Sequence, residues 1–193
     1  MSRTLAAAAA VAMLLAACGG GGGDDDADHP QGPLAKYSGT YTYCDRHERG
    51  TMTSTASADG RALTLTLRSD YYQQSGCTGA IVGTETISSP VTATYLSTGT
   101  AQVVGWPSAS SSATRTVDRV QVTAPATTVS LTGSGVTSVD GQPCVVYTNG
   151  RTCLESTANG PLNDVAGIAF TDTALLLLVV AGAGYELDTA FQR

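Results

Sequence analysis

The residues best suited to moving protons lie in one short segment, Asp45-Arg46-His47-Glu48-Arg49. A histidine beside carboxylates can act as a general base. Catalytic triads, however, normally draw their members from distant segments, whereas these residues follow one another directly. The spacing therefore favours a polar β-turn, with His47 in a solvated loop, over a catalytic centre.

Other catalytic patterns in the sequence are weak. Asp172-Thr173-Ala174 and Asp188-Thr189-Ala190 both lack the glycine of the Asp-Thr-Gly pattern of aspartic proteases. Nucleophile-elbow, zinc-protease, P-loop and dinucleotide-binding glycine patterns do not occur in the sequence. We therefore expect a protein that is not an enzyme and uses no cofactor or metal. A cell-envelope hydrolase with clustered carboxylates is the alternative.

Three large aromatic residues are candidates for ligand binding. Tyr71, Tyr72 and Trp106 are expected at strand ends or loop edges, where their rings could stack on sugars or contact apolar ligands. Rings at strand ends also cap hydrophobic cores, and the sequence leaves both interpretations open. The partner they would suit is an apolar ligand, a glycan or another envelope protein.

Charge and length restrict the classes of function. The chain has 193 residues, a net charge of −6 and one lysine, Lys36. Binding to nucleic acid needs clustered Lys and Arg against phosphates, so the composition argues against it. The length suits one compact domain.

The N-terminal residues 1–17 are predicted to be a signal peptide. Arg3 precedes an apolar run of eleven residues, Leu5 to Leu15, which would rise only about 16 Å as a helix and is too short to span a bilayer. Next comes Leu15-Ala16-Ala17-Cys18, which resembles the lipobox of bacterial lipoproteins. The resemblance implies cleavage before Cys18, lipidation of Cys18 with acyl chains such as palmitate, and anchoring to a membrane. Because Gly19 and not aspartate follows Cys18, the well-studied sorting scheme favours the outer membrane.

Residues 18–34 are expected to form the lipidated cysteine and a flexible tether. Five glycines precede Asp24, Asp25, Asp26, Asp28 and His29. A coil of this length has an end-to-end distance of roughly 20–25 Å. Its acidic run lacks the preorganised geometry of a metal site, so we interpret it as solvated.

Residues 35–193 are predicted to be a single all-β domain. Apolar and polar residues alternate, as in Leu63, Leu65 and Leu67, and turn signals such as Ser89-Pro90 recur every eight to twelve residues. Tyr185, Leu187 and Phe191 are expected to share one strand face. The pattern is typical of an antiparallel sandwich or a lipocalin-like up-and-down barrel of about ten strands, with at most a short helical turn at 161–167.

One strand, Leu175 to Val180, is apolar without interruption. Alternate residues of a strand point to opposite faces, so both faces of this one should be buried. The cover could be the 161–167 segment, a packed second sheet or a partner subunit, and the choice between core and interface stays open.

Four cysteines remain after Cys18, and in an exported protein they imply two disulfides. An up-down-up path through residues 37–72 brings Cys44 and Cys77 to the same end. Cys144 and Cys153 flank Asn149-Gly150. A loop from Tyr147 to Gly150, with Gly150 left-handed, would place these two cysteines opposite each other.

These observations predict a lipoprotein of the bacterial outer membrane, anchored through Cys18 and facing the periplasm or the cell surface. Its disulfide-linked β domain is expected to act as a binding or structural and interaction module.

Overall fold

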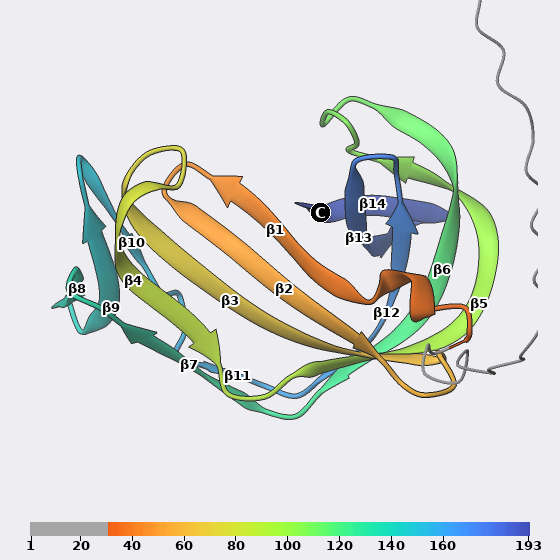
Figure 1. Cartoon of the computed structure of the whole chain (residues 1–193), viewed down its shortest axis with the longest axis horizontal. Coiled ribbons are helices and arrows are strands. Elements are labelled where there is room, and N and C mark those ends of the chain that lie inside the picture. The colour runs from red at the N-terminus through yellow and green to blue at the C-terminus, as the bar shows by residue number, and fades with distance from the viewer. Residues whose placement is uncertain (1–30) are drawn as a thin grey trace, which may run out of the picture.

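The computed structural model describes residues 31–193, so the predicted signal peptide, Cys18 and the tether up to residue 30 lie outside the described residues. A three-residue 3₁₀ helix, η2 (Ala35–Tyr37), precedes fourteen strands (Figure 1). Their bounds are β1 (Gly39–Asp45), β2 (Glu48–Ala56), β3 (Ala62–Gln74), β4 (Thr78–Ile87), β5 (Val91–Val104), β6 (Ser112–Ala124), β7 (Thr127–Thr132), β8 (Val136–Val139), β9 (Gln142–Tyr147), β10 (Gly150–Cys153), β11 (Ala158–Asn159), β12 (Leu162–Phe170), β13 (Ala174–Ala181) and β14 (Gly184–Gln192). The all-β prediction is confirmed, with more strands than the ten expected. Residues 31–193 include no helix of the length and apolarity needed to cross a membrane.

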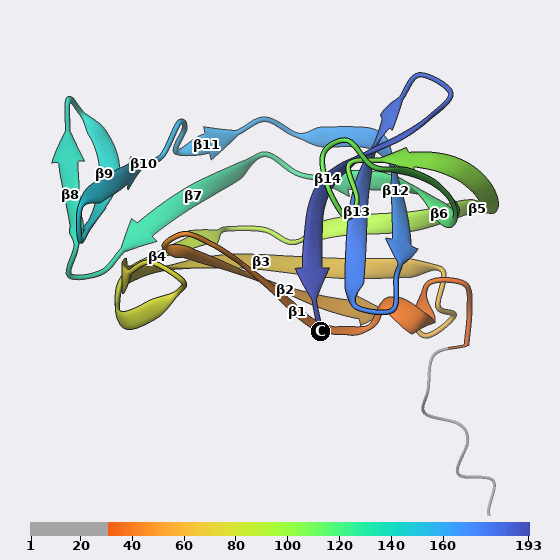
Figure 2. The same cartoon turned by 90° about the horizontal axis from the view of Figure 1, so that it is seen from above.

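Eight of the strands close into a barrel-like ring that follows chain order. The pairings run β1, β2, β3, β5, β6, β12, β13 and β14, and each neighbouring pair is antiparallel. The ring closes where Thr42 of β1 pairs with Gln192 of β14. Figure 2 shows β12–β14 running across β1–β3 on the other side of the ring. An antiparallel meander of this kind was one of the two predicted architectures.

Beyond the ring, β4, β7 and β11 continue strands of the barrel. β4 and β5 pair with the same edge of β3, through Arg68↔Thr86 and Leu65↔Val91. Ser89-Pro90 is therefore a break within one long strand, and its interpretation as a turn between neighbouring strands was wrong. β6 continues into β7 in the same way, and β11 continues into β12.

Prolines account for these three breaks. The β5–β6 register, Thr92↔Thr123, extends to place Pro90 opposite Pro125. The β6–β12 register, Leu162↔Ala124, extends to place Pro161 opposite Pro125 as well. Proline has no N–H to donate to a sheet ladder. Three prolines in a row across adjacent strands therefore interrupt the ladder at one level, where the barrel gives way to an open sheet.

Two hydrophobic cores lie on opposite faces of β13. The main core fills the barrel, and Leu175 of β13 belongs to it. The second core lies outside the barrel wall and includes Leu176 and Leu178, which are 0% and 1% exposed. It is covered by the curled end of the β5–β6 hairpin, where Val103 pairs in parallel with Tyr185 of β14. The uninterrupted apolar run thus has a cover from its own chain.

This cover corrects two details of the sequence interpretation. The segment 161–167 is not a helical turn over β13 but most of strand β12 beside it. The predicted burial of both faces holds for Leu175, Leu176 and Leu178 and in part for Leu177. It was wrong for Val179 and Val180, which are 46% and 51% exposed.

A β-bulge changes the faces of β14. The pairing shifts between Leu177↔Thr189 and Leu178↔Leu187, so Asp188 is an extra residue in β14. As a result Leu187 packs on the second core, whereas Phe191 packs in the main core. The prediction that these two residues share one face was therefore wrong, because a bulge reverses the alternation that follows it.

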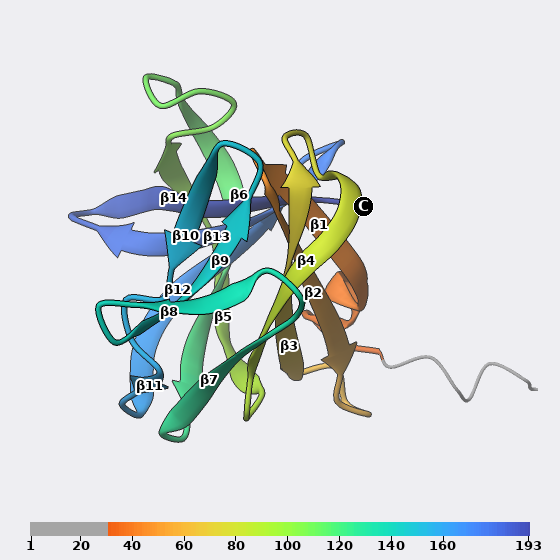
Figure 3. The same ribbon diagram turned by 90° about the vertical axis from the view of Figure 1, so that its left-hand side faces the viewer.

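Both predicted disulfides are present, Cys44–Cys77 and Cys144–Cys153. Cys144 and Cys153 lie directly opposite each other, in the register that pairs Tyr147 with Gly150. The turn between them is only two residues long, and Asn149, with φ +67°, takes the left-handed conformation expected of Gly150. Strands β8–β10 form a small separate sheet at the end of the molecule farthest from η2 (Figures 1 and 3).

Candidate functional site

The barrel holds an apolar cavity of about 510 Å³. Its floor is buried, since Met52, Ala93 and Val120 are fully covered, whereas Leu162 and Val179 at its rim are 38% and 46% exposed. The volume lies within the range of about 300–1,000 Å³ that is usual for small-molecule sites. The lining residues are Met52, Leu65, Leu67, Val91, Ala93, Val120, Val122, Leu162, Asp164, Val165, Ala166, Gly167, Ile168, Leu177, Leu178, Val179, Val180 and Asp188.

The mouth of the cavity lies at the row of prolines. Val91 and Leu162 follow Pro90 and Pro161 directly, and both line the cavity. Beyond this level the strands continue as β4, β7 and β11 and no longer close a ring. The prolines thus determine the position of the mouth, because the closed part of the barrel ends at their level.

The opposite end of the barrel is plugged by the segment before β1. Leu34, directly before η2, and Tyr37, its last residue, are almost completely buried in the main core. The prediction that the tether extends to residue 34 was therefore wrong at its end, because Leu34 is part of the folded domain. The Tyr37 ring packs on Phe170 at 4.8 Å between centroids. Phe170 ends β12, whereas Leu162 at the rim begins it, so the plug and the mouth lie at opposite ends of that strand.

A buried carboxylate fastens the plug. Asp118 is 1% exposed and accepts hydrogen bonds from Tyr37 Oη at 2.7 Å and from Thr98 Oγ1, and Lys36 Nζ lies 2.6 Å from its Oδ2. Burial acts to raise the pKa of Asp118, but the hydrogen bonds from Lys36, Thr98 and Tyr37 outweigh it and hold that pKa below its usual value. Burial and the bond to Asp118 raise the pKa of the Tyr37 hydroxyl.

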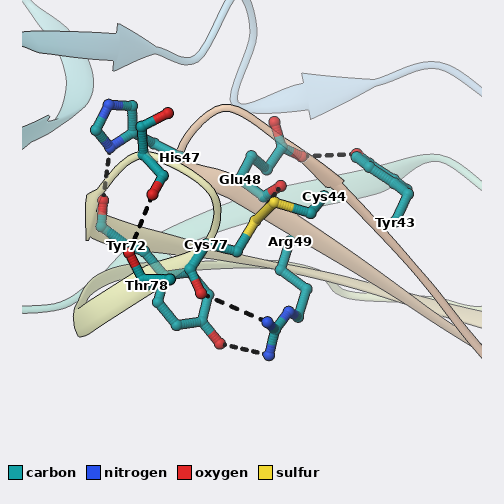
Figure 4. The surroundings of a disulfide bond; sticks show 9 residues. Tyr43, Cys44, His47, Glu48, Arg49, Tyr72, Cys77 and Thr78 are labelled. Carbon is teal, nitrogen blue, oxygen red and sulfur yellow. Dashed lines mark hydrogen bonds between the residues drawn. A yellow bond between two sulfur atoms is a disulfide. The ribbon is translucent and has the colours of Figure 1, made fainter.

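The three aromatic residues proposed from the sequence as ligand-binding do not come together, and none lines the cavity. Tyr71 is buried and its hydroxyl donates to Glu85 Oε2 at 2.8 Å. The Tyr72 ring lies under the Arg49 guanidinium, at 5.0 Å, and its hydroxyl accepts a bond from Arg49 Nη1 (Figure 4). Trp106, in the turn after β5, packs against the second core.

His47 is not in a solvated loop, which corrects the prediction from its sequence context. Its ring stacks on Tyr147 of β9 at 3.9 Å between centroids and is half-buried. Its Nδ1 lies 3.0 Å from the carbonyl oxygen of Tyr72, beside the Cys44–Cys77 disulfide (Figure 4). The imidazole therefore joins the β1–β2 turn to the β8–β10 sheet.

Two carboxylates on the inner side of β2 and β4 come nearest to the predicted alternative of clustered acidic groups. Glu48 Oε1 accepts hydrogen bonds from Tyr43 Oη at 2.8 Å and Ser69 Oγ at 2.6 Å, and Glu85 accepts one from Tyr71. Burial, followed by these bonds to carboxylates, raises the pKa of both tyrosines. Within residues 31–193 no three His, Cys, Asp or Glu side chains are grouped closely enough to hold a metal ion.

The residues that line the cavity were not recognised as a site from the sequence. Most are ordinary inward-facing aliphatic residues of strands, for which alternation predicts burial and not an empty space. The available signal was Asp164, a charged residue in the apolar alternation of Leu162, Ala166 and Ile168. Asp164 stands out as a charged residue on an apolar face only if residues 162–170 are interpreted as a strand.

Comparisons of the chain with protein-family models, curated proteins and solved structures find no match.

Proposed function

We propose that the β domain binds a small apolar ligand and that Cys18 anchors it, by its acyl chains, to the bacterial outer membrane. The observation that carries the proposal is the cavity of about 510 Å³, with its buried aliphatic floor and exposed rim. Burying apolar surface contributes about 25 cal/mol per Å², so an aliphatic ligand would gain most of its affinity from leaving water. The lipobox-like sequence before Cys18 supports the anchoring.

The position of the mouth supports a role in binding at a membrane. The described chain enters the barrel at η2, which plugs the end of β12 opposite the cavity mouth. A tether attached to that end leaves the mouth unobstructed. The domain could therefore collect a ligand while its N-terminal side remains held.

The cavity can be tested with N-phenyl-1-naphthylamine, a neutral dye whose fluorescence rises in apolar surroundings. The protein for this test is the full chain carrying Cys18→Ala, purified without detergent, so that no acyl chain competes. Ala166 lines the cavity and is half-buried, and Ala166→Phe would fill part of the space. We expect this variant to bind the dye at least about tenfold more weakly, a loss of about 1.4 kcal/mol.

The matched control is Ala158→Phe, the same change on the exposed strand β11 away from the cavity. It should leave dye binding unchanged. Two results would show that the cavity is not a ligand site. One is that the Cys18→Ala chain, with Ala158 and Ala166 unchanged, does not bind the dye. The other is that Ala166→Phe binds the dye as well as Ala158→Phe does.

A further inference from the structure

Among the residues that the structure describes, those that line the cavity include two carboxylates and no basic side chain. Asp164 of β12 and Asp188 of β14 line the cavity, and the other lining residues are apolar or glycine. Both aspartates are exposed. The two strands lie on either side of β13, and Asp188 lies beside Leu177, which pairs with Ile168 of β12, so the two charges lie at separate points of the cavity lining.

Strand geometry directs Asp164 to the cavity. Leu162, Ala166 and Ile168 alternate with outward residues of β12 and all line the cavity, and Asp164 occupies the position between them. It pairs with Val122 of β6, which also lines the cavity. Asp164 is therefore the charged member of an otherwise apolar face, placed where that face reaches water.

Asp188 faces the cavity because of the bulge in β14. The residue before it, Leu187, packs on the second core outside the barrel wall. As the extra residue of the bulge, Asp188 lies on the cavity side of the strand instead. Bulges often redirect a side chain next to a functional site.

Neither carboxylate forms an ion pair with a basic side chain within residues 31–193. The two ion pairs within residues 31–193 are Lys36–Asp118 and Arg68–Asp70, and neither involves Asp164 or Asp188. Asp188 Oδ2 accepts a hydrogen bond from Thr189 Oγ1 at 3.0 Å, whereas Gln121 bonds the backbone oxygen of Asp164. With the net charge of −6, these groups make the cavity attractive to cations.

We infer that the ligand of this cavity is a cationic amphiphile, with an aliphatic chain in the barrel and a positive head group attracted to the exposed carboxylates of Asp164 and Asp188. This inference rests on the proposed function and specifies its ligand class. A positive group a few ångströms from an exposed carboxylate gains about fivefold in affinity, and a negative group loses a similar factor.

The test compares three amphiphiles with the same chain: dodecyltrimethylammonium, dodecanol and dodecyl sulfate. Each competes, below its micelle concentration, with N-phenyl-1-naphthylamine for the full Cys18→Ala chain. We expect the cation to compete at concentrations at least about tenfold lower than the anion, with dodecanol between them. Added salt should reduce this ratio, because exposed charges are screened.

Two double variants decide whether the preference is local. With Asp164→Asn and Asp188→Asn combined, the cation and the anion should compete with the dye at nearly equal concentrations. The concentration at which dodecanol competes should not change. Asp140→Asn with Asp172→Asn removes the same charge from exposed turns outside the cavity lining and should preserve the ratio.

The outcomes separate the two proposals. If dodecanol displaces the dye but the cation and the anion compete equally, the inference about charge is wrong and the apolar site stands. The inference is also wrong if both double variants lose the ratio to the same extent, because net charge alone would then explain it. If no amphiphile displaces the dye, the proposed function itself fails.

Discussion

At the scale of single residues, Asp118 shows how one buried charge can organise the end of a barrel. A carboxylate out of contact with water is costly unless hydrogen bonds compensate it. Here Tyr37, Thr98 and the sole lysine, Lys36, supply them. The three donors come from η2 and β5, so the carboxylate holds the plug to the strands around it.

We expect Asp118→Asn to destabilise the protein by about 1–3 kcal/mol at neutral pH, since it weakens hydrogen bonds to a charged group. Lys36→Met should cost less, about 1 kcal/mol or under, because the side chain of Lys36 is half exposed and its ion pair is screened. Urea denaturation of both variants measures the difference. Equal losses would show that the ion pair, and not the buried network, stabilises the plug.

The same network predicts a dependence on pH. Because the pKa of folded Asp118 lies below its usual value of 3.8, its stabilisation is present above that value and is lost as the pH falls through the lower, folded pKa. The stability difference between the wild-type chain and Asp118→Asn should therefore shrink below about pH 4. A difference that stays constant down to about pH 2 would contradict this assignment.

Residue type alone was a poor guide to the site. Tyr71, Tyr72 and Trp106 were chosen because large rings often bind ligands, yet each is engaged by the protein itself. A cavity forms where facing side chains leave space, and that depends on residues far apart in sequence. Leu67 and Val179 look like any strand residues until the barrel places them around one opening.

At the scale of secondary-structure elements, alternation predicted strands and faces well where the pairing is regular. Strands β1–β3 and the Cys44–Cys77 link follow the predicted up-down-up path. The prediction failed where register changes. Pro90 looks like a turn locally, and only its position opposite Pro125 shows that it interrupts a longer strand. The bulge at Asp188 has no local signal of its own.

Strand β13 allows a direct test of the two-core arrangement. Leu176→Ala and Leu178→Ala each leave space in the second core and should lower the stability by about 2–5 kcal/mol. Val180→Ala, on the same strand but half exposed, should cost less than about 0.5 kcal/mol. Thermal denaturation of the three variants checks this. Equal melting temperatures for Leu176→Ala and Val180→Ala would mean that the β5–β6 hairpin does not cover β13.

At the scale of the whole molecule, the ends of the barrel differ. One end is plugged by Leu34 and Tyr37, and the other opens at the row of prolines into the aliphatic cavity. Within the described residues the chain reaches the plugged end first, at Leu34, the last residue of the predicted tether. A tether of flexible coil would let the domain reorient, so the mouth need not face the membrane that holds the lipid.

The final prediction is that Cys18→Ala releases the protein from the membrane. Two or more acyl chains hold a protein stably, at about 0.8 kcal/mol per buried CH₂, and the variant removes the thiol that would carry them. Cells labelled with palmitate and then fractionated should show labelled protein in the membranes for the wild-type chain, and unlabelled protein outside them for the variant. Gly19→Ala is the neighbouring control and should retain both label and membrane recovery. Equal label and equal membrane recovery in Cys18→Ala would mean that the lipobox-like sequence does not anchor this protein, while the proposals about the cavity would still stand on their own tests.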